Sequence, residues 1–323
     1  MTERSGLLID AAELAALLRD EAELPAGAPR TRVLDVRWSL AEPDGRPAYR
    51  DGHIPGAVYV DLDRELSTHG PADLGRHPLP DAKSLTAAAR RWGLGSGDRV
   101  VAYDGGGNFA SARLWWLLRD AGFGDGRLRS AGLADVRLLD GALPAWVAAG
   151  LPLETGDVTP AFGTVTLESG RLPSIGLEDV ADFAREHLLL DVRAAERYEG
   201  RTEPIDPRAG HVPGAHNLPT GGNLDEAGRF LPSETLRERF ASAGVGAADV
   251  ESAGAESAGV ASAGVESADV GAARVGAYCG SGITASHTLF ALALAGIEGE
   301  LFPGSWSQWS NHPELPVATG PNP

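Results

Sequence analysis

The chain is poor in sulfur and in positive charge. It holds a single cysteine among 323 residues, which argues against a disulfide framework and against a thiolate-rich metal site. Its 28 lysines and arginines face 45 aspartates and glutamates, so the net charge is −17. This balance disfavours nucleic acid and anionic membrane surfaces as partners, and an anionic substrate would have to be attracted by local basic groups.

Long apolar runs are also missing. No stretch is long enough to span a bilayer, so we expect no membrane partner. Residues 1–20 lack the basic region and apolar core of a secretory signal. Together with the single cysteine, these features predict a cytoplasmic protein. A length of 323 residues favours two domains of ordinary size.

The one cysteine lies in the most informative stretch of the chain. The apolar residues 275–278 predict a buried strand, Cys279 follows it, and residues 285–295 predict a helix. Small residues fill the loop between them, and such a loop gathers backbone N–H groups into a nest at the positive end of the helix. We expect a nucleophilic thiolate there that is reachable from solvent. The alternative is that Cys279 is a small buried hydrophobic residue.

Several short motifs occur twice, which indicates a duplication. Residues 34–37 recur at 190–193, 52–57 at 210–215, 103–105 at 278–280, and 141–146 at 304–309. Short apolar strands alternate with helices, so the predicted fold is α/β: a tandem duplication of one domain, each a mainly parallel sheet with helices on both faces. Ligands bind at the carboxyl ends of such strands, where Asp104 and Cys279 occupy matching places.

The repeats also suggest domain boundaries. We predict a first domain over residues 1–150, a linker over 151–173 and a second domain over 174–323. A degenerate tract rich in Ala, Gly, Ser and Glu interrupts the second domain at about residues 241–274. We interpret this tract as a surface insertion without chemistry, and a partner-binding arm is the alternative.

Residues 279–285, Cys-Gly-Ser-Gly-Ile-Thr-Ala, together with the duplicated Gly-His-x-Pro-Gly-Ala turns, resemble the two-domain rhodanese family. The loop is most similar to the 3-mercaptopyruvate sulfurtransferase type, and the resemblance covers nearly the whole chain. It implies that Cys279 carries sulfur as a persulfide, without a metal or organic cofactor. It also implies that the first domain is not catalytic, since Asp104 stands in the place of the cysteine.

The resemblance further implies the partners. A small-molecule sulfur donor would be 3-mercaptopyruvate, with thiosulfate as the alternative, and the acceptor would be a thiol, a thioredoxin-like protein or cyanide. Thiosulfate-preferring relatives commonly carry basic residues directly after the cysteine, whereas Gly280 and Ser281 are neutral. This difference favours 3-mercaptopyruvate.

Four catalytic residues follow from the resemblance. Ser281, His77 and Asp63 match the Asp–His–Ser arrangement of mercaptopyruvate enzymes, beside the nucleophile Cys279. A histidine next to a hydroxyl could handle protons during cleavage of the donor. The alternative is that Asp63 and His77 only tie down a loop between the domains.

The resemblance also implies the substrate-binding residues. Arg197 and Arg208 match the family's substrate arginines, whose planar forks hold a carboxylate through two hydrogen bonds. The alternative for Arg208 is a solvated loop charge. The loop N–H groups would hold the persulfide, and the residues that supply them are Gly280, Gly282, Ile283 and Thr284.

Several polar residues of the repeats are expected to be structural. Arg37 and Arg193 occur in both halves, which favours ion pairs with nearby aspartates over catalysis, and His53 and His211 are interpreted as turn residues.

Two other classes of function fit the sequence less well. A related fold carries cysteine phosphatases, whose loops read Cys-x5-Arg, but position 285 is Ala. A non-catalytic binding module fits the first domain but not Cys279.

Overall fold

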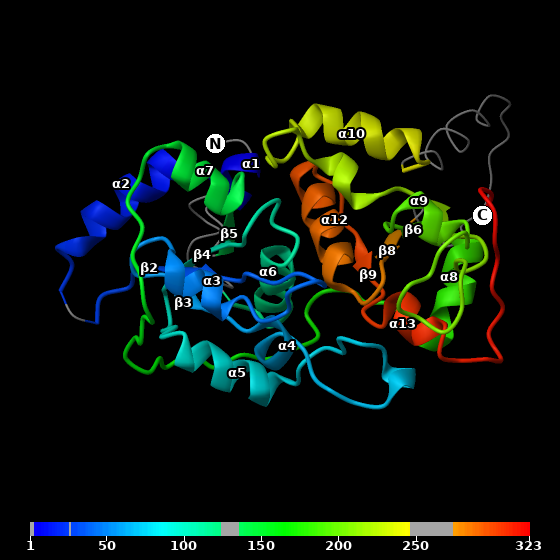
Figure 1. Cartoon of the computed structure of the whole chain (residues 1–323), viewed down its shortest axis with the longest axis horizontal. Coiled ribbons are helices and arrows are strands. Elements are labelled where there is room, and N and C mark those ends of the chain that lie inside the picture. Colours follow the sequence, from blue (N-terminus) through cyan, green and yellow to red (C-terminus); the bar gives the residue numbers. More distant parts are fainter. Residues whose placement is uncertain (1–2, 26, 124–135, 246–273) are drawn as a thin grey trace, which may run out of the picture.

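The computed structural model describes residues 3–25, 27–123, 136–245 and 274–323. Two parallel sheets are arranged next to each other, and the helices α6 (Ser111–Asp120) and α12 (Ile283–Leu294) pack together between them (Figure 1). The predicted α/β class and the tandem duplication are confirmed.

The four strands of the second sheet match four strands of the first in order, because β7-β6-β8-β9 corresponds to β3-β2-β4-β5. The first runs β1-β5-β4-β2-β3 and the second runs β7-β6-β8-β9, with every ladder parallel. The strands are β1 (Leu8–Ile9), β2 (Thr31–Asp35), β3 (Val58–Tyr59), β4 (Arg99–Tyr103), β5 (Val136–Leu139), β6 (Leu188–Asp191), β7 (His216–Asn217), β8 (Val275–Tyr278) and β9 (Glu300–Leu301). A single parallel bridge between Ser174 and Leu301 stands where the first sheet has β1.

Helices connect the strands as parallel pairing requires. Besides α6 and α12 they are α1 (Glu3–Leu7), α2 (Ala11–Ala22), α3 (Arg46–Asp51), α4 (Leu62–Glu65), α5 (Ala82–Arg91), α7 (Ala142–Ala148), α8 (Val180–Glu186), α9 (Ala195–Tyr198), α10 (Ser233–Ser242) and α13 (Ser305–Trp309). Asp10 caps α2, because its carboxylate accepts the backbone N–H of Glu13 at 2.8 Å.

The duplicated turns are equivalent down to single contacts. His53 stacks on Tyr49 with ring centroids 4.1 Å apart, and His211 stacks on Tyr198 at 3.7 Å. In both repeats Nδ1 of the histidine bonds the carbonyl of that tyrosine, at 2.9 and 2.8 Å. Both histidines are fully buried, so their interpretation as turn residues is confirmed.

The repeated arginines also have matching roles. Arg37 donates to Asp35 at 2.6 Å, and Arg193 donates to Asp191 at 2.5 Å. In each repeat the arginine also reaches a glycine carbonyl of the histidine turn, at 2.6 and 2.7 Å. The predicted ion pairs are therefore present, and the additional hydrogen bonds connect the carboxyl end of one strand to the neighbouring turn.

One apolar core crosses the contact between the two halves. Trp115 of α6 meets Phe290 of α12 edge to face, with centroids 4.8 Å apart. Arg4 of α1 donates to the carbonyls of Phe230 and Leu231, each at 2.8 Å, near the start of α10. The interface is therefore apolar at its centre and hydrogen-bonded at its edge, which holds the two sheets in one relative position.

Most of the predicted insertion, residues 246–273, lies outside the described residues. Within the described ranges, no helix combines the length and the hydropathy that a bilayer crossing requires.

Candidate active site

Cys279 follows β8 directly and stands just before α12. Gly282 caps that helix with φ +81°, a left-handed conformation that favours glycine, and a side chain there would run into the carbonyl of Pro303. Its backbone N–H points back at the sulfur, with N to Sγ 3.1 Å. Ile283 and Thr284 form the first turn of α12, whose N–H groups have no carbonyl partners within the helix. The predicted strand, loop and helix are thus present around Cys279.

The expected accessibility of the thiol is wrong. Cys279 is only 2% exposed and belongs to the apolar core, and its neighbour Ser281 is 5% exposed. The backbone of Cys279 is held by a bond from its N–H to Ser305 Oγ at 3.1 Å and by the N–H of Trp306 on its carbonyl at 3.0 Å. The sulfur therefore lies beneath the surface.

In the matching loop of the first domain, the backbone N–H groups bind the carboxylate of a residue of the loop itself, Asp104. The Asp104 carboxylate accepts the N–H groups of Gly106, Asn108 and Ala110 at 2.9 to 3.0 Å, and that of Ser111 at 3.4 Å. Burial raises the pKa of Asp104 to about 6, while these N–H groups act in the opposite direction. The loop geometry that the two domains share therefore directs N–H donors at the position that Cys279 occupies in the second.

The structure brings Ser281, His77 and Asp63 together across the two domains. Nδ1 of His77 is 2.8 Å from Ser281 Oγ, and its Nε2 is 3.2 Å from Oδ1 of Asp63. Asp63 also accepts the indole N–H of Trp38 at 3.0 Å, and the Trp38 ring packs edge-on against His77 at 5.5 Å. These contacts fix the imidazole next to the loop.

The imidazole of His77 is neutral at physiological pH. Burial lowers the pKa of His77 to about 4, and Arg113 and Arg76 act in the same direction. Burial raises the pKa of Asp63, and the Trp38 hydrogen bond opposes that shift. An ionised Asp63 selects the tautomer with hydrogen on Nε2, which leaves Nδ1 to accept the Ser281 hydroxyl proton.

Arg197 lies at the loop, as predicted, in a group of charged side chains. It donates to Glu203 at 2.7 Å and to Asp206 at 3.3 Å. A methyl group on Gly280 would lie 3.4 Å from its Nη1 and 3.0 Å from Nη2 of Arg76. Arg76 comes from the first domain and pairs with Asp206. Burial raises the pKa of Asp206, with both arginines acting against the shift.

Arg208 is placed differently from the expectation. Its guanidinium donates to the carbonyls of Trp309, Ser310, His312 and Leu315 at 2.6 to 2.9 Å. Four of its five N–H donors are therefore occupied by the C-terminal segment, so at most one remains for a substrate. The contacts of Arg208 indicate a structural role.

Arg113 is a residue that the sequence analysis missed. It extends from α6 and is 0% exposed, and its guanidinium donates to the carbonyls of His77 at 2.9 Å, Gly282 at 3.4 Å and Leu66 at 3.5 Å. Within the described residues it has no carboxylate partner. Burial lowers the pKa of Arg113 to about 10, and the charge of Cys279 opposes this shift. One buried cation thus joins the histidine loop to the cysteine loop.

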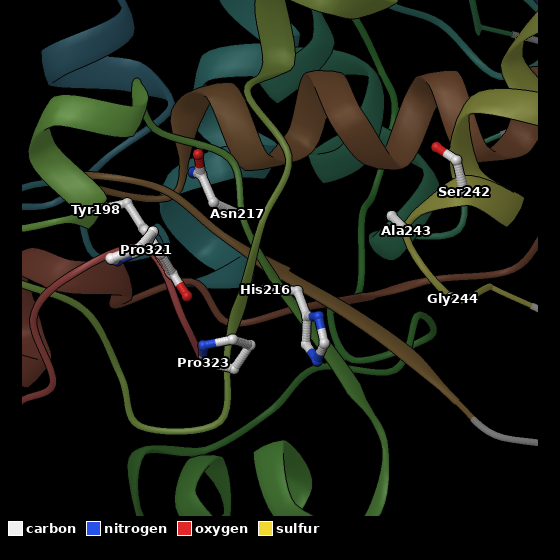
Figure 2. A pocket seen from close by; sticks show the side chains of 8 residues that line it. All are labelled: Tyr198, His216, Asn217, Ser242, Ala243, Gly244, Pro321 and Pro323. Carbon is white, nitrogen blue, oxygen red and sulfur yellow. The ribbon is translucent and has the colours of Figure 1, made fainter.

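The chain has another concavity away from these residues. A pocket of about 450 Å³ is lined by β7, the end of α10 and the C-terminus, including Tyr198, His216 and Pro323 (Figure 2). Among the described residues that line it there is no arginine or lysine, so it is poorly suited to an anionic donor. Across the described ranges, no cluster of three or more His, Cys, Asp or Glu side chains could hold a metal ion.

Comparisons with known proteins identify the family. Residues 10–149 match the model of the rhodanese-like domain. The chain is 42% identical to the putative thiosulfate sulfurtransferase SseB of Mycobacterium tuberculosis, over 99% of both chains. It is 40% identical to the probable 3-mercaptopyruvate sulfurtransferase of Pseudomonas aeruginosa, over 98% of this chain and 99% of the other.

A solved structure shows the same fold. The 3-mercaptopyruvate sulfurtransferase SseA of Escherichia coli superimposes with a TM-score of 0.69 at 25% identity, covering 93% of this chain and 98% of the other. Three findings therefore agree: an identity of 40% or more to sulfurtransferases over the full length, the match to the domain model, and the shared fold. The chain belongs to the rhodanese family and is a sulfurtransferase.

Proposed function

We propose that this sulfurtransferase moves a sulfur atom from 3-mercaptopyruvate to a thiol or cyanide through a persulfide on Cys279. The observation that carries the proposal is the chain of contacts from Asp63 through His77 to Ser281, two residues after the cysteine. This hydrogen-bonded chain ends at the loop in which the N–H of Gly282 meets the sulfur.

The first half-reaction needs no outside oxidant. The Cys279 thiolate attacks the donor sulfur, an S–S bond forms, and the C–S bond of 3-mercaptopyruvate breaks. The bonding electrons stay on carbon as the enolate of pyruvate, which then takes up the proton that the donor thiol loses. The products are pyruvate and the Cys279 persulfide, whose negative charge the Gly282 N–H and the first turn of α12 stabilise.

Ser281 and His77 handle the proton in this proposal. The neutral imidazole accepts the Ser281 hydroxyl hydrogen at Nδ1, so the hydroxyl can deliver a proton to the enolate and recover one from the donor thiol. Asp63 stabilises the imidazole in the required tautomer. Gly280, Gly282, Ile283 and Thr284 supply the backbone around the persulfide, and Arg197 binds the donor carboxylate.

In the second half-reaction an acceptor removes the outer sulfur and restores the thiolate. A thiol would leave as a persulfide and cyanide as thiocyanate, and a thioredoxin-like protein would act through its thiol. Two half-reactions through a covalent intermediate give ping-pong kinetics. We place this activity in the cytoplasm on the sequence argument given above.

Mass spectrometry tests the proposal directly. The peptide containing Cys279 should gain one sulfur atom after treatment with 3-mercaptopyruvate and lose it after addition of dithiothreitol. A Cys279 peptide of unchanged mass after donor treatment would refute the persulfide.

Thiosulfate is the second candidate donor, because the relative at 42% identity is named for it. Measuring kcat/KM for both donors with cyanide as acceptor separates the two. A clear preference for thiosulfate would overturn the assignment of the donor while leaving the persulfide in place.

A further inference from the structure

Arg76 comes from the first domain but is attached to the catalytic loop of the second. Its backbone N–H donates to Ser307 Oγ at 3.0 Å, and the N–H of Ser307 donates to the carbonyl of Gly280 at 2.8 Å. A methyl group on Gly75 would lie 2.9 Å from the carbonyl oxygen of Gly304, so these two segments of the backbone approach closely. The position of Arg76 is therefore coupled to that of the loop.

The guanidinium of Arg76 lies over the residue that follows the nucleophile. Nη2 of Arg76 and Nη1 of Arg197 would be 3.0 and 3.4 Å from a methyl group on Gly280. Both arginines contact Asp206, each on a different carboxylate oxygen. Asp206 thus orients two cations from two domains toward the same point.

Arg76 has donors to spare at this point. Among the described residues only its Nη1 has a hydrogen-bond partner through the side chain, and its Nε is buried with none. A buried N–H without an acceptor is unfavourable, so the side chain of Arg76 has hydrogen-bonding capacity that the fold does not use. By contrast, most of the donors of Arg208 are occupied by carbonyls.

We propose that Arg76 is a donor-binding residue, which together with Arg197 forms a two-arginine clamp over Gly280 for the anionic group of the sulfur donor. The loop itself is neutral at positions 280 and 281, and the clamp supplies the missing charge from two other segments. The donor site is then complete only when the two domains are together. This inference depends on the proposed function, because it concerns the donor of the same cysteine.

The clamp selects for a small anion with its charge close to the transferable sulfur. A side chain on Gly280 would occupy the space between the loop and the guanidinium groups, so glycine keeps both cations near the backbone. A carboxylate and a sulfonate-like group both accept paired N–H donors. Removal of Arg76 should therefore weaken both 3-mercaptopyruvate and thiosulfate, and the doubly charged thiosulfate more strongly.

The test separates donor binding from structural support. Arg76→Ala, Arg76→Lys and Arg64→Ala are compared with the unmodified protein, the last as a control because the Arg64 side chain is 83% exposed. Loading of the persulfide is measured against the concentration of each donor. Its removal by dithiothreitol, a neutral thiol, is measured separately after the donor has been washed out.

We expect the KM for both donors to rise about 10- to 100-fold in Arg76→Ala, the range for loss of a charge-assisted hydrogen bond. Arg76→Lys should recover part of this loss, Arg64→Ala should leave KM unchanged, and removal by dithiothreitol should keep its rate. If Arg76→Ala does not fold, Arg76→Gln replaces it with the same expected rise in KM.

Two results would overturn the inference. One is an unchanged donor KM in Arg76→Ala, and the other is an equal slowing of both half-reactions together with a lower melting temperature. Either result leaves the proposed function standing, provided that the unmodified protein forms the persulfide. Failure of the unmodified protein to form it would instead refute the proposed function.

Discussion

Replacing Arg113 by methionine should separate activity from stability. The charged guanidinium is completely buried, and burial lowers its pKa below the ordinary value of arginine, to about 10. This difference corresponds to about 3 kcal/mol by which the buried charge destabilises the fold. Because the folded pKa is the lower one, the cost is fully present below pH 10 and is relieved as the pH rises above it.

The hydrogen bonds of Arg113 act against that cost. Its best contact, to the carbonyl of His77 at 2.9 Å, would be lost, and an unsatisfied buried carbonyl costs about 1–3 kcal/mol. Arg113→Met keeps the apolar volume, so the two effects nearly cancel. We expect a free energy of unfolding within about 2 kcal/mol of the unmodified protein. Activity should nevertheless fall about 10- to 100-fold, because the histidine loop loses its link to Gly282 and the cysteine loses a nearby cation.

Denaturant unfolding and kcat/KM for 3-mercaptopyruvate, measured on the same preparation, test this prediction. Arg119→Met on the same helix is the control for removing one positive charge. Full activity in Arg113→Met would show that the guanidinium does not position the site. A loss of stability well above 3 kcal/mol would show that the carbonyl contacts outweigh the cost of burying the charge.

Three further predictions concern the site residues. Cys279→Ser should abolish sulfur transfer with little change in melting temperature, because the two side chains are similar in size; retained turnover contradicts it. Arg197→Ala should raise the donor KM, whereas Arg208→Ala should mainly lower the melting temperature, since four carbonyls lose their donor; the reverse pattern would restore Arg208 to the donor site. With its pKa lowered to about 4, His77 should give kcat/KM an acid limb near pH 4, and a limb near 6.5 argues against its role. Because unfolded His77 binds its proton first, it also destabilises the fold as pH falls from 6.5 toward 4.

The fold was largely predictable because its apolar strands and repeated turns are local patterns. The strand Val275–Tyr278 has the bounds expected from the sequence. The helix after Cys279 begins two residues earlier than expected, because the left-handed Gly282 caps it at Ile283. The two-residue strand β1 was missed, since two residues show no periodicity.

The candidate site was predictable only in part. Family resemblance located Cys279, Ser281, His77 and Asp63, but the approach of the last two to the loop depends on how the domains pack, which no local pattern encodes. Arg113 had a signal that was not used, since it is a lone charge inside the apolar, tryptophan-rich helix α6. For Arg76 the only signal in the sequence was its position directly before His77. The thiol was expected at the surface, and no local pattern in the sequence indicates that it is buried.

The carboxylate of Asp104 makes the loop of the first domain behave differently from the matching loop of the second. In the proposed reaction the loop of the second domain accepts a sulfur atom and releases it in every cycle, whereas the anion in the loop of the first domain is the Asp104 side chain itself, which does not leave. The first-domain loop and the start of α6 are thus held in one conformation throughout turnover. Arg113, projecting from that helix, therefore holds the carbonyls of His77 and Gly282 from a support that is already in place.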